Sequence, residues 1–268
     1  MSVPVLMYHS VKANPPRTTA SLAVDPAAFA DQMALLADRG FTPVPFGALS
    51  HGPLPAKPVV ITFDDGYADF HDTALPILAS AGFAATVFVT TGWLADAGPD
   101  AAGTPLDSML SWTRLREAAS AGIEVGGHSH SHPQLDQLPA PELREELARN
   151  KELLEDRLGV PVTTMAYPYG YSSLRVRRAV AAGGYTLACA VANRAARHDI
   201  GTSGTTSHDD VLAVPRLTVR WSTSLETFGR IVDTRDLSRI YRRDHALTRG
   251  YAIVRRTRYA ARRVTGHA

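Results

Sequence analysis

Two adjacent carboxylates and a group of three histidines are the residues of this sequence best suited to chemistry. Asp64 and Asp65 follow an apolar run in the stretch TFDDG. His128, His130 and His132 lie in GGHSHSHP, after another short apolar run. Adjacent like charges repel each other, so such a pair persists most easily beside a cation or an arginine. Two imidazoles and one carboxylate are typical of a catalytic metal site, which keeps one coordination position open.

Each of these motifs also has a plainer explanation. The aspartates could form a solvated turn in which one of them caps the next helix. The histidines could belong to an exposed polar loop. If they do bind a metal, the spacing leaves the pair open: alternation allows 128 with 130 or 130 with 132, and a turn allows 128 with 132.

Two further stretches could contribute to a site. Residues 166–170 read AYPYG after an apolar run, and a tight turn of this kind can direct a backbone N–H at an oxyanion. A plain turn is the alternative. The chain begins MSVPVLMYHSV, which places His9 at the end of a short apolar run. Taken alone, this histidine is better explained as a structural residue.

Short apolar runs alternate with amphipathic helical patterns, which predicts an α/β fold with a parallel sheet. The expected strands cover residues 3–8, 59–63, 85–89, 123–126, 162–166, 186–190 and 214–219. The first expected helix starts at Pro26, after the cap Asp25. The other expected helices cover residues 73–81, 111–121, 141–158, 173–182 and 225–232. A closed barrel is the leading form for a single domain of about 250 residues, and a doubly wound open sheet is the alternative.

Composition and charge narrow the class of protein. The 268 residues favour one large domain, and the single cysteine, Cys189, excludes an intrachain disulfide and is expected in a buried strand. Residues 235–268 carry ten arginines and two aspartates, hence a charge of +8, against −6 for the rest of the chain. Nucleic acid is not an expected partner, because the body is acidic and carries no matching motif.

The basic C-terminal stretch has two interpretations. It could form a basic helix at an anionic membrane surface, or it could be a solvated tail. Neither a signal peptide nor an apolar run of about 20 residues is present in the sequence. We therefore expect a cytoplasmic protein, with the tail as the place for any peripheral membrane contact.

The order and intervals of TFDDG at 62–66, HSHSHP at 128–133 and YPYG at 167–170 resemble those of the polysaccharide deacetylases. This family is also called the NodB-homology domain, or carbohydrate esterase family four. The connecting phrases FHDTALPIL and ATVFVTTGWL fit as well. The resemblance implies a distorted, TIM-like (β/α)7 barrel that removes N-acetyl groups from amino sugars. We therefore expect a catalytic domain over residues 1–232 and a basic tail over residues 233–268.

The resemblance also implies roles for individual residues. A divalent metal, most often Zn²⁺ with Co²⁺, Ni²⁺ or Mn²⁺ as alternatives, would be held by Asp65, His128 and His132. Asp64 would be the general base, and the backbone amide of Tyr169 would help to hold the oxyanion. His130 falls at a variable position of the family, so it is expected outside the ligand set.

Two departures from the family pattern concern the remaining catalytic groups. The third motif often begins with an arginine that orients the catalytic aspartate, and Ala166 stands there in this chain. Arg216 is the candidate replacement, with a surface arginine as the alternative. Many members also carry a late Leu-x-His whose histidine is the general acid, and none follows residue 200 here.

One branch of the family, which includes the biofilm poly-N-acetylglucosamine deacetylases, resembles a circular permutation of the barrel. Its acid-bearing strand is moved to the N-terminus. The LMYH at residues 6–9 fits as this displaced motif, in a Leu-x-x-His form. His9 is therefore expected to act as the general acid at the end of the first strand.

An N-acetylated glycan or a lipid-linked sugar is the expected substrate. Two other functions fit the same motifs: hydrolysis of a small or cyclic C–N substrate, and glycan binding without catalysis. The complete Asp-Asp and His set argues against the second of these. The expected sugar contacts are Tyr8, Tyr67, Tyr167 and Pro168. Further aromatic candidates are Trp93, Trp112 and Trp221. The alternative for these residues is a position in the core or at the rim of the barrel.

Overall fold

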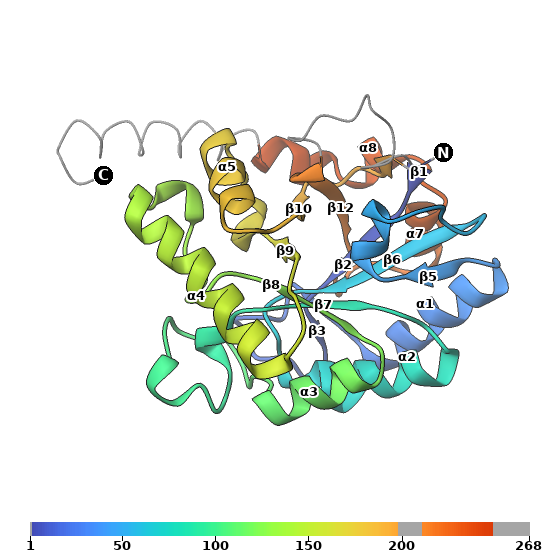
Figure 1. The fold of residues 1–268 in the computed structure, drawn as a ribbon. Helices are drawn as coiled ribbons and strands as arrows, with labels where there is room; N and C mark the ends of the chain where they lie inside the picture. The colour runs from blue at the N-terminus through green and yellow to red at the C-terminus, as the bar shows by residue number, and fades with distance from the viewer. Residues whose placement is uncertain (1, 198–210, 249–268) are drawn as a thin grey trace.

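A closed barrel of parallel strands, surrounded by helices, makes up the structure (Figure 1). This computed structural model describes residues 2–197 and 211–248. The strands pair in the order β2, β12, β10, β9, β8, β7 and β6, and β6 pairs back with β2, which closes a ring of seven. The expected (β/α)7 barrel is confirmed, and the open doubly wound sheet is excluded.

The ring strands coincide with the predicted ones, with slightly different bounds. They are β2 (Val5–Tyr8), β6 (Pro58–Phe63), β7 (Thr86–Val89), β8 (Glu124–Gly127), β9 (Thr164–Ala166), β10 (Leu187–Val191) and β12 (Val214–Thr218). Outside the ring, β5 (Thr42–Val44) pairs with the first half of β6. Two short pairs complete the set: β1 (Ser2–Val3) with β11 (Ala196–Arg197), and β3 (Ser10–Val11) with β4 (Ala23–Val24).

Two helices begin at capping side chains that the sequence predicts. Asp25 accepts hydrogen bonds from the N–H groups of Ala27 and Ala28, and Ser111 accepts one from Arg114, so both predicted starts are confirmed. The helices are α1 (Pro26–Asp38), α2 (Leu75–Ala81), α3 (Trp112–Ser120), α4 (Ala140–Leu158), α5 (Leu174–Ala182), α7 (Leu225–Val232) and α8 (Leu237–Ile240). A π-helical turn, Phe70–Ala74, precedes α2.

The barrel strands are buried on both faces, which explains their continuous apolar runs. One hydrophobic cluster contains no residue of an α-helix and fills the barrel interior; its strand members are Val3, Val5, Val60, Phe88, Ala166, Leu187, Cys189, Ala196 and Val214. The other face of each strand packs against the surrounding helices. Cys189 is fully buried in β10, as the sequence predicts.

Tyr8 lies on the helix side of β2. Its ring is fully buried between Phe29 and Phe63, with centroid distances of 5.2 Å and 5.4 Å, and its hydroxyl donates to Gln32 Oε1 at 2.8 Å. Successive side chains along an extended chain point in opposite directions. Tyr8 therefore points away from the side that carries His9, and the expectation that it contacts sugar is wrong.

Replacing Tyr8 by Phe tests this assignment. The Tyr8→Phe variant should lose about 1 kcal/mol of unfolding free energy, because the buried Gln32 oxygen loses its donor. Adding Gln32→Leu should recover much of that loss, since replacing both partners of a buried hydrogen bond with apolar groups is nearly neutral. Urea denaturation measures both, and an unchanged midpoint in the single variant would contradict the assignment.

The described chain continues to pack on the barrel after Val232. Tyr241 is buried and its hydroxyl donates to the Thr218 carbonyl oxygen at 2.8 Å. The boundary between a domain at 1–232 and a tail at 233–268 stays a prediction, and residues 249–268, with most of the basic charge, lie outside the described residues. No helix in the described ranges combines the length and apolar character needed to cross a bilayer. The cytoplasmic location and the membrane contact stay predictions.

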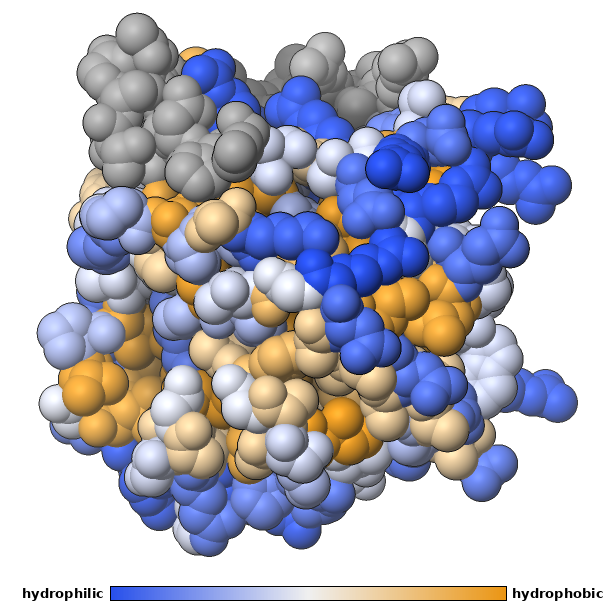
Figure 2. Space-filling model, turned by 90° about the vertical axis from the view of Figure 1, so that its right-hand side faces the viewer, coloured by the Kyte–Doolittle hydropathy of each residue, from blue (hydrophilic) through white to orange (hydrophobic). Residues whose placement is uncertain are grey.

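The surface is mixed in character. On the face shown in Figure 2, small groups of hydrophobic residues are separated by hydrophilic ones. Among the described residues, the large hydrophobic side chains with high exposure are Leu106, Val160, Tyr169, Leu174, Trp221, Leu225 and Leu247. Several of them, including Tyr169 after β9 and Trp221 after β12, follow the carboxyl end of a barrel strand, which is where active sites of such barrels lie.

Candidate active site

The residues predicted for catalysis and metal binding meet at one end of the barrel. His9 follows β2, Asp64 and Asp65 follow β6, His128 follows β8, and Tyr169 follows β9. Because all ring strands are parallel, their carboxyl ends share one rim. The structure therefore brings together His9, Asp64, Asp65, His128, His132 and Tyr169 around one cavity, with Arg216 of β12 in contact with Asp64.

Three of these residues form a cluster with metal-ligand geometry. Asp65 Oδ1 lies 3.2 Å from Nε2 of His128 and 3.2 Å from Nε2 of His132. Each residue offers one ligand atom, and these three atoms lie within 4.8 Å of one another. Among the described residues, this is the group of three side chains that could hold one metal ion. His130 instead pairs through Nδ1 with Thr91 Oγ1 at 3.0 Å. Of the three histidine pairs that the spacing allows, the structure brings together 128 and 132.

The protonation pattern of the cluster fits a bound cation. His128 Nδ1–H donates to the Ala166 carbonyl oxygen at 2.8 Å, so its Nε2 presents a lone pair to Asp65. Asp65 Oδ1 is buried and has no hydrogen-bond donor. Burial alone would raise the pKa of Asp65, but when His128 and His132 each carry a proton on Nε2 in place of a cation, their hydrogen bonds to the carboxylate outweigh burial and hold the pKa well below its usual range. An ionised oxygen facing imidazole lone pairs is the donor set that Zn²⁺-like ions prefer.

Asp64 does not belong to this cluster, and its partner is Arg216. The guanidinium donates to both carboxylate oxygens at 2.6 Å, and a third hydrogen bond of 3.1 Å goes to Thr62 Oγ1. Arg216 is completely buried, so the surface alternative is excluded. Burial would raise the pKa of Asp64, but the charge of Arg216 outweighs it and holds the pKa below its usual value. Asp64 is therefore ionised at neutral pH.

His9 lies near both aspartates, at the end of β2. Its Nε2 is 4.0 Å from Asp64 Oδ2. The N-terminal strand β2 pairs with β12 on one edge and with β6 on the other, as the permuted arrangement requires. The pKa of His9 is lowered because burial outweighs the opposite effects of Asp65 and Asp64.

Tyr169 occupies an unusual backbone conformation at the cavity. Its φ is 60°, in the left-handed region that few residues other than glycine adopt. Its N–H donates to no other described residue. Its half-exposed ring packs against His132 with a centroid distance of 4.8 Å. An N–H without an acceptor at a residue that lines the cavity is compatible with the oxyanion role, which stays a prediction.

The expected sugar contacts are only partly placed at the cavity. Tyr67 lines it, although only 2% of its surface is exposed. Tyr167 also borders the cavity, but its side chain is fully buried in the core and its hydroxyl donates to the Leu212 carbonyl oxygen at 2.8 Å. Pro168 is buried and does not line the cavity. The expectation of sugar contacts is therefore wrong for the Tyr167 ring, because it is packed in the core, and for Pro168, because it is buried away from the cavity.

The three tryptophans have three different environments. Trp112 belongs to the main core, and Trp93 packs against His132 with a centroid distance of 4.7 Å. Trp221 is 52% exposed. Trp93 therefore supports a ligand ring, and Trp221 is the one tryptophan with surface to offer a sugar.

The sequence analysis missed two polar residues of α4 that hold the histidine loop. Glu146 accepts the N–H groups of His130 and Ser131, each at 2.9 Å. Asn150 is completely buried and donates to the Ser129 carbonyl oxygen at 2.7 Å. The loop needs this support because Ser129 and His132 both have positive φ. A buried-face asparagine between the helix leucines is the signal that would have revealed it.

Asp69 is a third residue that spacing did not reveal. Its carboxylate accepts the Ser10 hydroxyl at 2.8 Å and the Val11 N–H at 2.9 Å. These are the two residues that follow His9, so Asp69 ties the strand end bearing His9 to the segment bearing Asp64. Burial raises the pKa of Asp69 above its usual value, against the effect of these two hydrogen bonds.

The Arg216–Asp64 pair should dominate local stability. Arg216→Met should lower the unfolding free energy by about 3–5 kcal/mol, because it leaves the Asp64 carboxylate buried and unpaired. Combining it with Asp64→Asn should recover part of that loss, since the charge is then removed as well. Chemical denaturation of the single and double variants measures the coupling, and strictly additive effects would contradict it.

Comparison with known proteins agrees with this geometry. The model of a family described as polysaccharide deacetylase matches residues 51–188. The Bacillus subtilis (strain 168) protein YxkH, whose name assigns it provisionally to the polysaccharide deacetylases, is 28% identical over 237 residues, which are 87% of this chain and 76% of the relative.

Two further similarities extend the comparison. The poly-beta-1,6-N-acetyl-D-glucosamine N-deacetylase of Escherichia coli (strain K12) is 29% identical over 131 residues, which cover 41% of this chain and only 18% of that protein. The structure of the Streptococcus pyogenes deacetylase PplD in complex with acetate superimposes with a TM-score of 0.74 at 27% identity, covering 88% of this chain and 99% of that one. Since the family model matches just over half of its length, the chain belongs to the polysaccharide deacetylase family.

Proposed function

We propose that this protein is a metal-dependent hydrolase that removes N-acetyl groups from amino-sugar glycans and releases acetate. The observation that carries the proposal is that the metal-ligand cluster, Asp64 and His9 meet at one cavity, with His9 Nε2 4.0 Å from Asp64 Oδ2. Asp64 and His9 both line this cavity, which supports the roles of base and acid that we propose for them. The names of the Escherichia coli relative and of the acetate complex support the substrate class.

Asp65, His128 and His132 would hold the divalent ion. When bound there, the ion polarises the acetyl carbonyl and makes a neighbouring water more acidic. The residues themselves do not identify the ion, because one carboxylate and two imidazoles suit Zn²⁺, Co²⁺, Ni²⁺ and Mn²⁺ to different degrees.

Asp64 would accept the proton of the attacking water. Its pairing with Arg216 keeps it ionised, and therefore able to act as a base, at neutral pH. The same pairing occupies both carboxylate oxygens and fixes the orientation of the group. The N–H of Tyr169 would donate to the oxyanion of the tetrahedral intermediate.

His9 would donate a proton to the leaving nitrogen. An amine leaves poorly unless it is protonated, so the second half of the reaction needs an acid. The lowered pKa of His9 makes its protonated form a stronger acid. It also leaves His9 mostly unprotonated at neutral pH, so the proton that His9 donates would be the one that Asp64 takes from water, and His9 Nε2 lies 4.0 Å from Asp64 Oδ2.

Removal of a metal ligand tests the metal dependence. Asp65→Ala should lose bound zinc in elemental analysis and lower acetate release from N-acetylglucosamine oligomers by more than about a hundredfold, since losing even an outer-shell partner costs 10–100-fold. Asp72→Ala, which changes an exposed aspartate of the same segment, is the matched control and should retain metal and turnover. Full activity of Asp65→Ala after exhaustive chelation would exclude the proposed metal site.

Replacement of His9 tests the acid. His9→Ala should retain its metal and lose about 10²–10⁴ in kcat on N-acetylated glycans. It should keep most of its activity on the acetate ester of an acidic phenol, because that leaving group departs without a proton. His71→Ala, at a half-buried histidine that does not line the cavity, serves as the control. Equal losses on both substrates would show general damage to the site, and no loss on either would remove His9 from the mechanism.

The assay on glycans also separates the two other functions considered for the motifs. A zinc-loaded protein that opens small cyclic amides but releases no acetate from glycans would be an amidohydrolase. A protein that binds glycans without turnover on any substrate would be a binding domain.

A further inference from the structure

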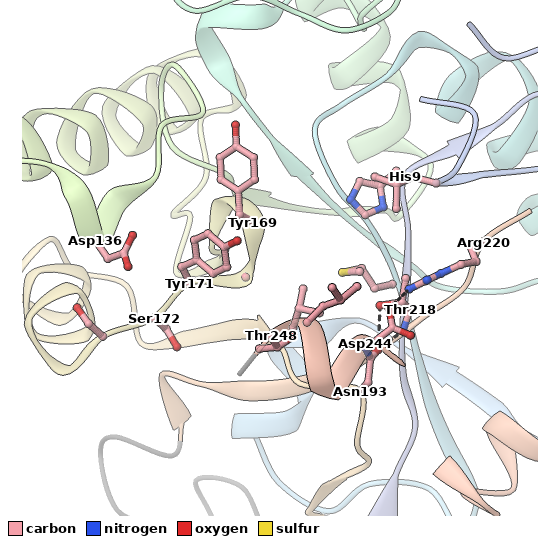
Figure 3. Close-up of a pocket in the computed structure, with 16 residues that line it drawn as sticks. His9, Asp136, Tyr169, Tyr171, Ser172, Asn193, Thr218, Arg220, Asp244 and Thr248 are labelled. Atoms are coloured by element: carbon pink, nitrogen blue, oxygen red, sulfur yellow. Dashed lines mark hydrogen bonds and ion pairs between the residues drawn. The ribbon is translucent and has the colours of Figure 1, made fainter. Parts of the chain in front are cut away.

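Among the described residues, none forms a hydrogen bond that would orient the imidazole of His9. Its Nδ1 is buried without a partner, and its Nε2 lies 4.0 Å from Asp64 Oδ2, which is too far for a hydrogen bond. Figure 3 shows the ring directed away from its strand, toward Tyr169 across the cleft. A group that moves a proton has to be held in place. The position of this imidazole therefore depends on the backbone that carries it.

The backbone is held on both sides of His9. On the amino side, β2 pairs with both neighbouring ring strands. On the carboxyl side, Ser10 and Val11 are fully buried, and one carboxylate binds them both. Asp69 Oδ2 accepts the Ser10 hydroxyl at 2.8 Å, and Asp69 Oδ1 accepts the Val11 N–H at 2.9 Å. A carboxylate that binds two successive residues fixes the direction in which the chain leaves His9.

Asp69 belongs to the same segment as the two aspartates of the site. It follows Asp64 and Asp65 and immediately precedes the π-helical turn. The segment is itself anchored, because the N–H of Ala68 donates to the Ser108 carbonyl oxygen at 2.9 Å. Only 8% of Asp69 is exposed, so water competes little for its two oxygens. One segment therefore carries the proposed base and also holds the chain that bears the proposed acid.

The other contacts on the carboxyl side of His9 are weaker. Strand β3 pairs with β4 over two residues only. Lys12 forms an ion pair with Asp107 at 2.8 Å, but the lysine side chain is 35% exposed. Ion pairs of this kind contribute little, because solvent screens them and both side chains have to be ordered. Asp69 is therefore the strongest anchor on this side.

We propose that Asp69 is a positioning residue for the proton transfer: by binding Ser10 and Val11 it keeps the imidazole of His9 in reach of Asp64 and of the leaving nitrogen. This inference rests on the proposed function, in which His9 is the acid. Asp69 lines neither the catalytic cavity nor the cleft beside it, and its carboxylate binds the chain after His9 and not the ring. It therefore acts without contact to substrate.

Two substrates with different leaving groups test the inference in the zinc-loaded, full-length protein. Asp69→Ala should lower kcat on N-acetylglucosamine oligomers by about a hundredfold, the cost typical of a misplacement of about 1 Å. It should leave kcat on the acetate ester of an acidic phenol nearly unchanged, because that leaving group departs without a proton. The zinc content should also stay unchanged. Equal losses on both substrates, or loss of zinc, would overturn the inference.

The conservative variant Asp69→Asn should retain much more glycan activity than Asp69→Ala. An amide can accept the Val11 N–H through its oxygen and donate to Ser10 Oγ through its nitrogen. Hydrogen exchange of the Val11 amide reports on the anchor directly, and it should become faster in the alanine variant but not in the asparagine variant. An asparagine variant as slow on glycans as the alanine variant would overturn the inference.

Glu124→Ala is the matched control. This carboxylate lies at the first residue of β8, at the amino end of the barrel. Like that of Asp69, it accepts hydrogen bonds from side chain and backbone: the hydroxyls of Thr86 and Thr164 and the N–H of Gly47. The variant should leave the ratio of glycan to ester kcat at the wild-type value. A fall in that ratio as large as in Asp69→Ala would show a general effect of lost stability and would overturn the inference.

A double-mutant cycle tests whether Asp69 acts through His9. In the His9→Ala background, Asp69→Ala should cause no further loss of kcat on glycans, because the group that it positions is already gone. Losses that multiply would show that Asp69 acts by another route, which would overturn the inference.

These measurements also separate the inference from the proposed function. If the wild-type protein releases no acetate from any glycan, the proposed function fails. Faster exchange at Val11 in Asp69→Ala alone would then still support the anchoring of the chain after His9. If the wild-type protein is active and His9→Ala is selectively slow on glycans, but Asp69→Ala is not, the proposed function stands and the positioning role is refuted.

Discussion

Two carboxylates on adjacent residues have to be buried at one end of this barrel. Their mutual repulsion is relieved because they face different partners: Asp64 takes the Arg216 guanidinium, and Asp65 takes the imidazoles of His128 and His132. The positive φ of 72° at Asp65 turns the backbone between them. This division of one charged pair gives an ionised and oriented carboxylate at Asp64, next to an Asp65 oxygen that has no hydrogen-bond donor.

The surrounding structure maintains that division. The histidine loop after β8 is held open by Glu146 and Asn150 of α4, which satisfy its backbone groups. On the other side, Asp69 holds the residues that follow His9. Asn150 and Asp69 are buried and Glu146 is half-buried, and each of them donates or accepts hydrogen bonds, which is the condition under which a buried polar network adds rigidity. The side chains that would contact substrate are thus held in place by residues that do not contact it.

Much of this arrangement could be predicted from the sequence, and the failures have physical causes. Helix starts at Asp25 and Ser111 follow from local capping chemistry, which needs no tertiary information. β5 was missed because its run is short and contains Pro43, and its pairing with β6 is a long-range contact. Tyr8 was assigned to the site because it adjoins His9, although alternation along the chain sends neighbouring side chains to opposite faces. The supports from Glu146, Asn150 and Asp69 depend on three-dimensional proximity that spacing does not encode.

Arg216 shows why a barrel tolerates the transfer of a catalytic partner between strands. The position where family members often have an arginine is Ala166 on β9, and here the guanidinium comes from β12, with only β10 between the two strands. Inward side chains of a closed ring converge on its axis, so a long side chain from either strand can reach the same carboxylate. Ala166 is small and completely buried in the interior, which leaves room for the Arg216 side chain, whose charged end lies 5.7 Å from the Phe88 ring. The same convergence applies to His9, because a strand that closes the ring occupies the same place whether it comes first or last in the chain. What the chemistry constrains is therefore the position of a group at the barrel axis, and the order of the strands along the sequence is free to change.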